Sequence, residues 1–427
     1  MTAPDAAPDV TVIMATYNRG RHIVPSIRSV LMQEGPTAEL LVVGDGCTDD
    51  TGEVVRAFPS DRVRWIERPH GGSQSFANNA GIAAARGRLI AYIGHDDVWA
   101  RGHLADLMAL FEARPGLDVG VAGAAYHRPG GLDPLRVTGL FVGEGGKVAA
   151  THFFPPSSIA HRRDLTERIG PWADPVTVRA PVDADLQLRA VAAGMSFAST
   201  ERLSVHKFAA GHRYLDYVEH SSGEQEAMLE RAHGDGAEAL AAETVGRSRR
   251  TGFLMSLHHA DFTAFEPGEI HARNRRAKGL GVALRPLHRR ETLTPRAGYY
   301  ALDWQGEPRH GTLWAHRNPR PRILLPFTGE GRARLNVPLV HPADVDPSAV
   351  VLEGPGIDWR GGRPHDGPAP SGCAITWLSA RLDLRGNAPS VATLRLPDVG
   401  EADLPRYGIG TVVVDPPDVP GPRLAHI

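Results

Sequence analysis

Two stretches, VTVIMATYNRG at residues 10–20 and AELLVVGDGCTDDT at residues 38–51, decide the fold of this chain. Each is an apolar run that ends in a polar or acidic cluster. The first run, from Val10 to Met14, suits a strand that is buried on both faces, as strands of parallel sheets are. A parallel-sheet enzyme that holds a nucleotide at the carboxyl ends of its strands has this sequence pattern.

The alternation of strand and helix patterns continues as far as residue 113. Such an alternation implies right-handed crossovers and an α/β fold with a mostly parallel, doubly wound sheet flanked by helices. We expect strands at 10–15, 39–44, 62–66 and 88–93, and helices at 20–34, 74–86 and 101–113, with one more helix opening near Asp49 and Asp50.

Between residues 115 and 215 the pattern is looser. An amphipathic helix and a strand are expected to close the first domain. The elements expected in this part are short strands at 119–126 and 137–142, a loop through FFPPSS at 153–158, a small helix at 163–169, the amphipathic helix at 183–193 and the closing strand at 202–208.

After residue 215 the sequence pattern changes twice. Residues 216–290 have the pattern of a helical segment followed by a basic linker, and residues 291–427 combine many Pro and Gly with short β-like runs. Such runs predict a small all-β accessory domain, either a sandwich or a jelly roll. We therefore divide the chain into a flexible tail (1–9), an α/β domain (10–215), the helical segment with its linker, and the β-rich domain.

The charge balance and the cysteine count narrow the class of protein. Lys and Arg number 47 against 49 Asp and Glu, for a net charge of −2, which gives no support for nucleic-acid binding. Two cysteines cannot form a disulfide framework, so we expect a cytoplasmic protein. We find no signal-peptide pattern and no apolar run long enough to span a bilayer. The basic segment 271–290 is either a solvated linker or a peripheral contact with anionic lipid at the inner face of the cell membrane.

Four motifs of the first half resemble those of a known family. They are ATYNRG at 15–20, VVGDGCTDDT at 42–51, YIGHDDVW at 92–99 and APVDADLQLRAVAAG at 180–194. In this order and spacing they resemble the motifs of the family-two inverting glycosyltransferases, which have the GT-A fold. The resemblance covers residues 10–215, about half of the chain.

The chain lacks three carboxylates that this family usually has. Gly44 stands in place of the first Asp of the acidic turn, Gly94 in place of the first Asp of the DxD motif, and Val182 in place of the Glu of an "ED" pair. These departures motivate a second interpretation, a nucleotide-sugar-binding or assembly protein whose catalytic site is impaired. A third interpretation is a nucleotidyltransferase, although ATYNRG lacks the Gly-rich basic loop of those enzymes.

The resemblance implies transfer of a sugar from a nucleotide-diphosphate donor to a hydroxyl acceptor, with inversion. We expect a UDP-sugar as donor, and a glycan, a lipid-linked sugar or a small molecule as acceptor, as in polysaccharide biosynthesis. Asp183 would be the general base that takes the proton of the attacking hydroxyl. Alternatively, Asp183 caps the helix at 183–193. Asp185, in the same turn, is expected to have a structural role.

A divalent cation, Mn²⁺ or Mg²⁺, would stabilise the charge on the leaving diphosphate. Such cations take oxygen ligands, often only one or two of them from protein carboxylates. Asp96 is the first candidate ligand and Asp97 the second, and His206 would supplement them. Alternatively, Asp96 and Asp97 cap the helix at 101–113.

The resemblance also implies donor contacts at Thr16, Asn18, Asp45 and Asn79, and Asp96 would reach the donor through the cation. An acidic residue after the second strand does comparable work in dinucleotide folds, which supports Asp45. Thr16 and Asn18 equally suit a turn that side-chain hydrogen bonds hold. Asp45 is otherwise a turn residue, and Asn79 an ordinary exposed helix residue.

A few further residues have two interpretations each. Lys207 and Arg213 are candidates for contacts with the diphosphate, and His212 is a candidate for the metal or the diphosphate. Trp172 either stacks on an acceptor sugar or packs in the core. The β-rich domain binds acceptor glycan, mediates oligomerisation or supports the catalytic domain.

Overall fold

The chain forms two units, seen here in a computed structural model. The first unit holds Met1–Arg213 and His220–Ala272, and the second holds Tyr214–Glu219 and Arg273–Ile427. The structure describes residues 7–127, 132, 134–140, 152–208, 222–251, 257–258, 262–278, 280, 284–293, 304–305, 312–315, 320–384, 389–397 and 406–417. Most of the predicted tail, together with His212 and Arg213, lies outside these residues.

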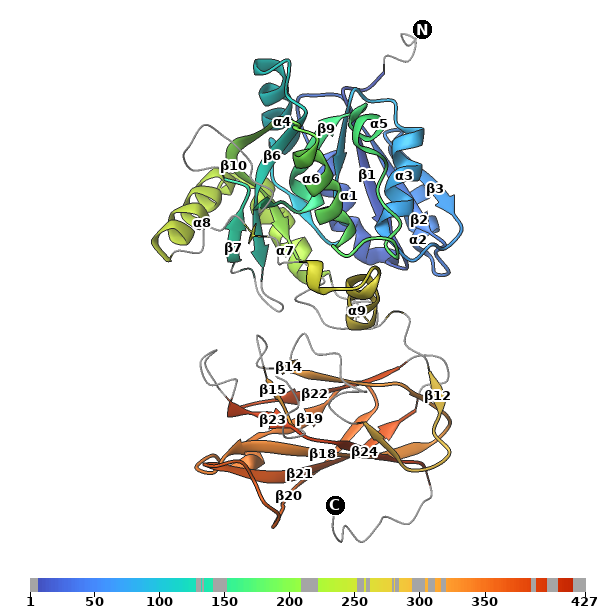
Figure 1. Ribbon diagram of the computed structural model, residues 1–427, viewed down its shortest axis with the longest axis vertical. Coiled ribbons are helices and arrows are strands. Elements are labelled where there is room, and N and C mark those ends of the chain that lie inside the picture. Colours follow the sequence, from blue (N-terminus) through green and yellow to red (C-terminus); the bar gives the residue numbers. More distant parts are fainter. Residues whose placement is uncertain are drawn as a thin grey trace. The chain divides into compact units, whose positions relative to one another are not determined.

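The first unit is built on one nine-stranded sheet with the order β3-β2-β1-β4-β9-β6-β10-β5, and β7 pairs with β6 (Figure 1). Its strands are β1 (Val10–Thr16), β2 (Ala38–Asp45), β3 (Val63–Arg68), β4 (Leu89–Tyr92), β5 (Val98–Trp99), β6 (Val119–His127), β7 (Pro134–Thr138), β9 (Ile159–Arg162) and β10 (Phe197–Lys207).

The direction of the strands confirms the predicted fold class. β3, β2, β1 and β4 are parallel neighbours, and so are β6 and β10. β9 is antiparallel to both β4 and β6, so β6 runs in the same direction as β4. The sheet is therefore mostly parallel. The sequence pattern did not predict the short strands β5 and β9, which add the antiparallel pairs.

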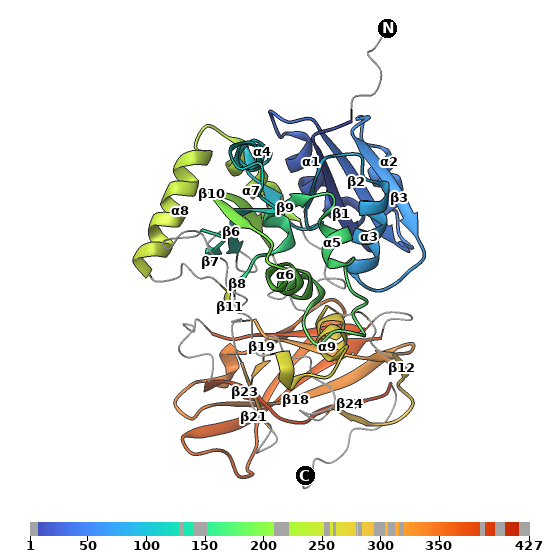
Figure 2. The same cartoon turned by 45° about the horizontal axis from the view of Figure 1, so that its top comes forward.

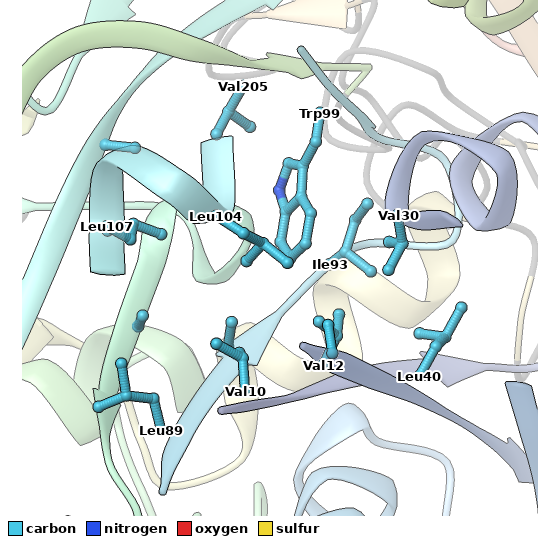
Figure 3. Packing of buried hydrophobic residues seen from close by; sticks show 14 of the residues in the cluster. Val10, Val12, Val30, Leu40, Leu89, Ile93, Trp99, Leu104, Leu107 and Val205 are labelled. Atoms are coloured by element: carbon cyan, nitrogen blue, oxygen red, sulfur yellow. The ribbon is translucent and has the colours of Figure 1, made fainter. Parts of the chain in front are cut away.

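Side chains of the parallel strands alternate between two buried faces, as the continuous apolar runs indicate. On β1, Val12 packs in one hydrophobic cluster and Ile13 in another, and both are fully buried. Figure 3 shows the first cluster, in which Val12 and Leu40 of the sheet lie below the Trp99 ring. The sheet therefore forms the middle layer of the unit.

Helices cover both faces of this sheet (Figures 1 and 2). α1, α2 and α4 pack on one face, and α3 and α6 on the other. The helices of the first unit are α1 (Val24–Leu31), α2 (Thr51–Arg56), α3 (Gln74–Ala84), α4 (His103–Ala113), α5 (Leu165–Ile169), α6 (Val182–Ala192), α7 (Gly223–His233) and α8 (Ala237–Thr251). The helix expected at 20–34 is split into a 3-10 turn, Gly20–Ile23, and α1.

Two elements follow α8. β11 (Leu257–His258) pairs with β8 (His152–Phe153), at the start of the segment that was expected to be a loop. α9 (Glu269–Ala277) lies where a basic linker was expected. None of the described helices is long and apolar enough to cross a membrane.

In its described part, the second unit has two main sheets around a shared core and the small pair β12-β17, which agrees with the predicted β-rich architecture. The larger sheet pairs β13, β24, β18, β23, β15 and β14 in that order, and β21 joins β18 to β20. The smaller sheet has the order β16-β22-β19. Inward side chains of both sheets, such as Leu335 and Leu394, form one cluster.

The strands of the second unit are short except at its centre. They are β12 (Arg285–Pro286), β13 (Glu291–Leu293), β14 (Trp304–Gln305), β15 (Leu313–Ala315), β16 (Arg322–Leu325), β17 (Phe327–Thr328), β18 (Arg332–Pro342), β19 (Val351–Glu353), β20 (Ile357–Pro364), β21 (Cys373–Asp383), β22 (Ser390–Arg395), β23 (Gly408–Ile409) and β24 (Val412–Asp415). β12 pairs with β17.

Three arginines of the basic segment form ion pairs. Arg285 and Arg289 lie 3.0 and 3.6 Å from the carboxylate of Glu291. Arg290 lies 2.7 Å from the carboxylate of Asp415, which is 1% exposed. These three charges already have partners within the second unit, which weakens the interpretation of the segment as a lipid contact.

Candidate active site

The carboxyl ends of β1 and β2 lie side by side. Thr16 ends β1 opposite Gly44, and Asp45 ends β2. The Thr16 side chain is 3% exposed, and its hydroxyl oxygen has no hydrogen-bond partner in the described part of the chain. A buried hydroxyl without a partner is costly, so this position suits a polar group of a ligand. A Cβ atom on Gly44 would collide with the Trp65 ring, which explains why no carboxylate stands there.

Asn18 ties the end of β1 to the loop after β2. Its amide nitrogen donates to the Thr48 hydroxyl at 3.0 Å, and its carbonyl oxygen accepts the Thr48 backbone N–H at 2.8 Å. Asn18 also has a positive φ of 45°, a conformation that Asn tolerates better than most residues. Of the two interpretations of Asn18, the structure favours the turn, because both functional groups of the side chain are engaged.

The carboxylate of Asp45 organises the loop after β3. It accepts backbone N–H groups of Gly71 and Gly72 at 3.0 and 2.7 Å, and it pairs with the guanidinium group of Arg68. His70 lies 3.3 Å from the same carboxylate. The Asp45 side chain is 7% exposed. Asp45 therefore shapes the edge of the site through this loop.

Tyr17 is a candidate residue that the sequence reasoning passed over. It follows Thr16 and is half-buried, and its ring lies 4.6 Å from that of His70. The two rings bring the ends of β1 and β3 together at the edge where Asp45 lies. The signal was present, since Tyr17 belongs to the motif ATYNRG, but nothing in the sequence placed His70 beside it.

The loop after β4 curls tightly around a buried carboxylate. Asp97 is fully buried, and it accepts the Ser157 hydroxyl and, at 3.1 Å, the backbone N–H of Phe208. A Cβ atom on Gly94 would lie 2.7 Å from Oδ2 of Asp97 and 3.0 Å from Oδ1 of Asp96. The glycine in place of the family's first Asp therefore makes room for this carboxylate.

Lys207 is the main partner of Asp97. Its ammonium nitrogen lies 2.7 Å from Oδ2 of Asp97, and 18% of its side chain is exposed. Burial would lower the pKa of Lys207, but the carboxylates of Asp97 and Asp96 raise it above its usual value. Lys207 is therefore a fixed positive charge, and Asp97 is its counterion. This corrects the prediction of Asp97 as an open metal ligand.

Asp96 differs from its neighbour in its surroundings. It is partly exposed, and its charge acts on both Asp97 and Lys207. The adjacent His95 lies with its Nδ1 atom 3.2 Å from the carbonyl oxygen of Ala15 on β1. Asp96 is thus held between the end of β1 and the Lys207 charge.

Hydrogen bonds connect this loop to α6. The Ser157 hydroxyl accepts the Gly94 backbone N–H at 3.0 Å. Near it, Phe154 exchanges two hydrogen bonds with the Gln187 side chain, of 2.9 and 2.6 Å. The same Gln187 nitrogen lies 3.2 Å from the carbonyl oxygen of Asp183. The FFPPSS segment therefore couples the loop after β4 to the first turn of α6.

Asp183 and Asp185 lie in the first turn of α6 but in different settings. Asp183 is partly exposed, and its Oδ1 atom accepts the backbone N–H of Ala184 at 3.0 Å. Asp185 pairs with Arg189 at 2.9 Å. Arg189 also donates to the carbonyl oxygens of Ile169, Gly170 and Pro171. These contacts support the structural role expected for Asp185.

Asn79, which was predicted to contact the donor, holds the backbone of Trp172 in this structure. Its amide nitrogen donates to the Trp172 carbonyl oxygen at 2.9 Å, and its oxygen accepts the Trp172 backbone N–H at 3.0 Å. The Trp172 ring is buried, and its indole N–H donates to the Tyr92 hydroxyl at 3.1 Å. Trp172 therefore packs in the core, and Asn79 holds its backbone.

His206 lies inside the protein, 2% exposed, with its Nδ1 atom 3.0 Å from Nε2 of His127. Nδ1 of His127 lies 2.8 Å from the carbonyl oxygen of Leu132, so it carries the proton of the neutral ring. Nε2 of His127 then accepts a hydrogen bond from the Nδ1–H group of His206. Burial lowers the pKa of His206 well below its ordinary value, and His127 adds to the effect. We therefore withdraw His206 as a metal ligand. Among the described residues, no three His, Cys, Asp or Glu side chains form a group suited to a metal.

Comparison with known proteins identifies the family of the first unit. Residues 11–165 match the family model described as Glycosyl transferase family 2. The succinoglycan biosynthesis protein ExoO of Rhizobium meliloti is 47% identical over 95 residues, which are 22% of this chain and 27% of ExoO. An uncharacterized glycosyltransferase of Nostoc is 28% identical over 233 residues, 51% of this chain and 70% of that protein. The match thus spans about a quarter of ExoO.

The comparison with solved structures includes a match from Staphylococcus aureus. Residues 1–349 of Staphylococcus aureus TarS are 18% identical to this chain, with a TM-score of 0.38. The similarity covers 57% of this chain and 74% of TarS 1–349.

Proposed function

We propose that this chain, which carries a glycosyl transferase family 2 domain at residues 11–165, transfers a sugar from a nucleotide-diphosphate donor to a hydroxyl acceptor, with inversion. The observation that carries the proposal is the gathering of polar groups at the carboxyl edge of the sheet. They come from the ends of β1, β2, β4 and β10, where an open parallel sheet binds its ligands. We propose a UDP-sugar as donor and a glycan, lipid-linked or small-molecule acceptor.

The nucleoside part of the donor would bind at the ends of β1 and β2. The unpaired Thr16 hydroxyl offers a hydrogen bond to a ligand. Tyr17 and His70 form an aromatic pair that a base could pack against. Asp45 fixes the loop that carries His70. We infer that Asp45 acts on the nucleoside mainly by shaping this loop, with its carboxylate edge as the further contact predicted from the sequence.

The diphosphate would bind near Lys207 and Asp96. Lys207 offers a fixed ammonium group, because Asp97 holds it in place. Asp96, partly exposed, fits a Mn²⁺ or Mg²⁺ site in which the diphosphate and water supply the other oxygens. A cation bound there would stabilise the negative charge on the leaving group.

Asp183 would take the proton of the acceptor hydroxyl as that oxygen attacks the anomeric carbon. Its partial exposure and its place in the first turn of α6 suit this role. The positive end of a helix dipole suits a negatively charged side chain at this position. Gln187 and Ser157 support its position relative to the donor loop.

Product analysis tests this function. The full chain is incubated with UDP-, GDP-, dTDP- and CMP-sugars and a panel of glycan acceptors, with and without Mn²⁺, and the products are analysed by mass spectrometry. Transfer yields a new glycoside and, from a diphosphate donor, a nucleoside diphosphate. A new nucleotide sugar with pyrophosphate would indicate a nucleotidyltransferase instead, and donor binding without any product would indicate an impaired binding protein.

A further inference from the structure

One face of the larger sheet of the second unit does not pack against the hydrophobic core. On β21, Leu378, Ala380 and Leu382 point inward and are 0–1% exposed. The residues between them, with Trp377 before Leu378, face the other side of the sheet. Trp377 is half-buried and takes no part in the core cluster. In Figure 1, β20, β21 and β18 lie side by side and form this face.

Trp377 lies at the centre of a flat row on this face. Arg363 of β20 stands opposite it on one side and Pro338 of β18 on the other. The ring of His365 meets the Trp377 ring edge-on, with the centroids 6.2 Å apart. The half-buried indole is an apolar platform for a sugar ring, and Pro338 is buried beside it. The indole also retains contact with water.

The next row leaves open space beside the indole. Gly361, which has a φ of 107°, stands opposite Ser379, and Ser379 stands opposite Asn336. A Cβ atom on Gly361 would meet nothing within 4 Å. The Ser379 hydroxyl donates to Oδ1 of Asn336 at 2.9 Å. This row offers the half-buried Ser379 hydroxyl next to the platform, and the buried Asn336 holds that hydroxyl from below. A hydroxyl is the kind of polar contact that sugar hydroxyls need.

Three exposed arginines lie on the same face as Trp377. Arg334 stands directly opposite Arg381, and Arg363 stands opposite Trp377. In the described part of the second unit, the guanidinium groups of all three have no ion pair or hydrogen bond. Arg381 also stands opposite Asp358 of β20, whose carboxylate pairs with Arg360. Like charges directly opposite each other destabilise a sheet, so an anion bound between Arg334 and Arg381 would offset the charges that face each other there. Guanidinium groups suit carboxylates, which they bind through paired hydrogen bonds.

Acidic residues of the same face have other partners. Asp358 pairs with Arg360, and Asp383 pairs with Arg332 at 2.9 Å. Among the described residues, these three arginines therefore remain as a local excess of positive charge in a chain whose net charge is −2.

We propose that this face binds an acidic polysaccharide. Trp377 packs against a sugar ring, the Ser379 row bonds its hydroxyl groups, and the three arginines bind its carboxylates. A bilayer or a nucleic acid would require a broader basic surface without acidic side chains, whereas Asp358 and Asp383 lie within this face. The site belongs to the second unit and uses no residue of the donor site. The proposal therefore does not depend on the proposed function.

Affinity electrophoresis of the full chain tests the proposal. Native gels contain polygalacturonate, alginate or neutral dextran, and retardation is compared among wild type, Trp377→Ala, Trp377→Phe, and an Arg363→Ala/Arg381→Ala double variant. Arg395→Ala is the matched control, since Arg395 lies on β22 of the other sheet and pairs with Glu353. Thermal midpoints check that each variant is folded.

We expect wild type and the Arg395 variant to be retarded by an acidic polymer and not by dextran. Trp377→Ala and the double arginine variant should bind roughly tenfold more weakly, and Trp377→Phe should retain part of the affinity. The proposal is overturned if neither acidic polymer retards the wild type, or if the variants bind as well as wild type. Binding to phosphatidylglycerol vesicles or single-stranded DNA but not to the polysaccharides overturns it as well.

Discussion

The ammonium nitrogen of Lys207 lies 2.7 Å from Oδ2 of Asp97, a carboxylate with no exposed surface. The pair joins the end of β10 to the loop after β4. The Ser157 hydroxyl donates to the same carboxylate, which connects the FFPPSS segment to the pair. A buried ion pair of this kind contributes little net stability, but it fixes the direction of each charge. Lys207 is thereby held ready for an anion without the cost of ordering a free side chain.

Replacing Lys207 with Met should weaken the binding of a nucleoside diphosphate about 10- to 100-fold, because a charge-assisted hydrogen bond to phosphate is lost. The affinity for the monophosphate should change little. Isothermal titration with UDP and UMP measures both affinities. Arg202→Met, which removes a charge from the same strand, is the control. If the wild type binds UDP and the Lys207 variant binds it equally well, Lys207 has no role at the diphosphate.

Replacing Asp97 alone should destabilise the first unit more than replacing Asp97 and Lys207 together. Asp97→Ala leaves the Lys207 charge without its partner, which costs about 3–5 kcal/mol of unfolding free energy. The double variant Asp97→Ala/Lys207→Met should recover part of this loss. Urea unfolding of the four proteins gives the coupling free energy between the two residues. Additive losses would show that the pair is not coupled.

Replacing Asn79 with Ala should lower the unfolding free energy by about 1–3 kcal/mol, because both backbone groups of Trp172 lose their partner. Donor affinity should stay within about twofold of wild type. Urea unfolding and UDP titration measure the two quantities. Asn274→Ala, at an exposed position of α9, is the control. A large loss of UDP affinity in a stable Asn79 variant would restore the donor contact predicted from the sequence.

Two buried histidines should make the first unit less stable in acid. Burial lowers the pKa of His161 to about 4 and that of His103 to about 3. Below about pH 6.5 the unfolded chain binds a proton on each histidine that the folded protein does not bind. Stability is therefore complete above pH 6.5 and falls, by about 1.4 kcal/mol per pH unit and histidine, as the pH drops toward 4. His161→Gln should reduce this slope in urea unfolding, and exposed His288→Gln should leave it unchanged.

The sequence predicted the fold better than the site. Long apolar runs such as β1 and β2 are buried on both faces, so their sequence pattern directly predicts strands of a parallel sheet. β9 is a four-residue strand, Ile159–Arg162, and its mixed composition carries no period that could place it at the centre of the sheet.

The roles of single site residues depended on contacts between distant segments. Asn79 and Trp172 are 93 positions apart, and Asp97 and Lys207 are 110 apart. A motif gives the type of side chain and the edge of the sheet where it lies. It does not say whether the side chain is already paired with another residue of the protein. That difference separates Asp97, which pairs with Lys207, from the partly exposed Asp96.

The most direct measurement of the central claim compares Asp183→Asn with wild type in donor binding and in sugar transfer. Asn has the shape of Asp but cannot take a proton, so the variant should fold, keep its UDP-sugar affinity and lose transfer at least about 100-fold. Asp185→Asn, which removes the charge paired with Arg189, should lose stability and retain transfer. Transfer by the Asp183 variant at a rate near that of wild type, with donor bound, would contradict the account.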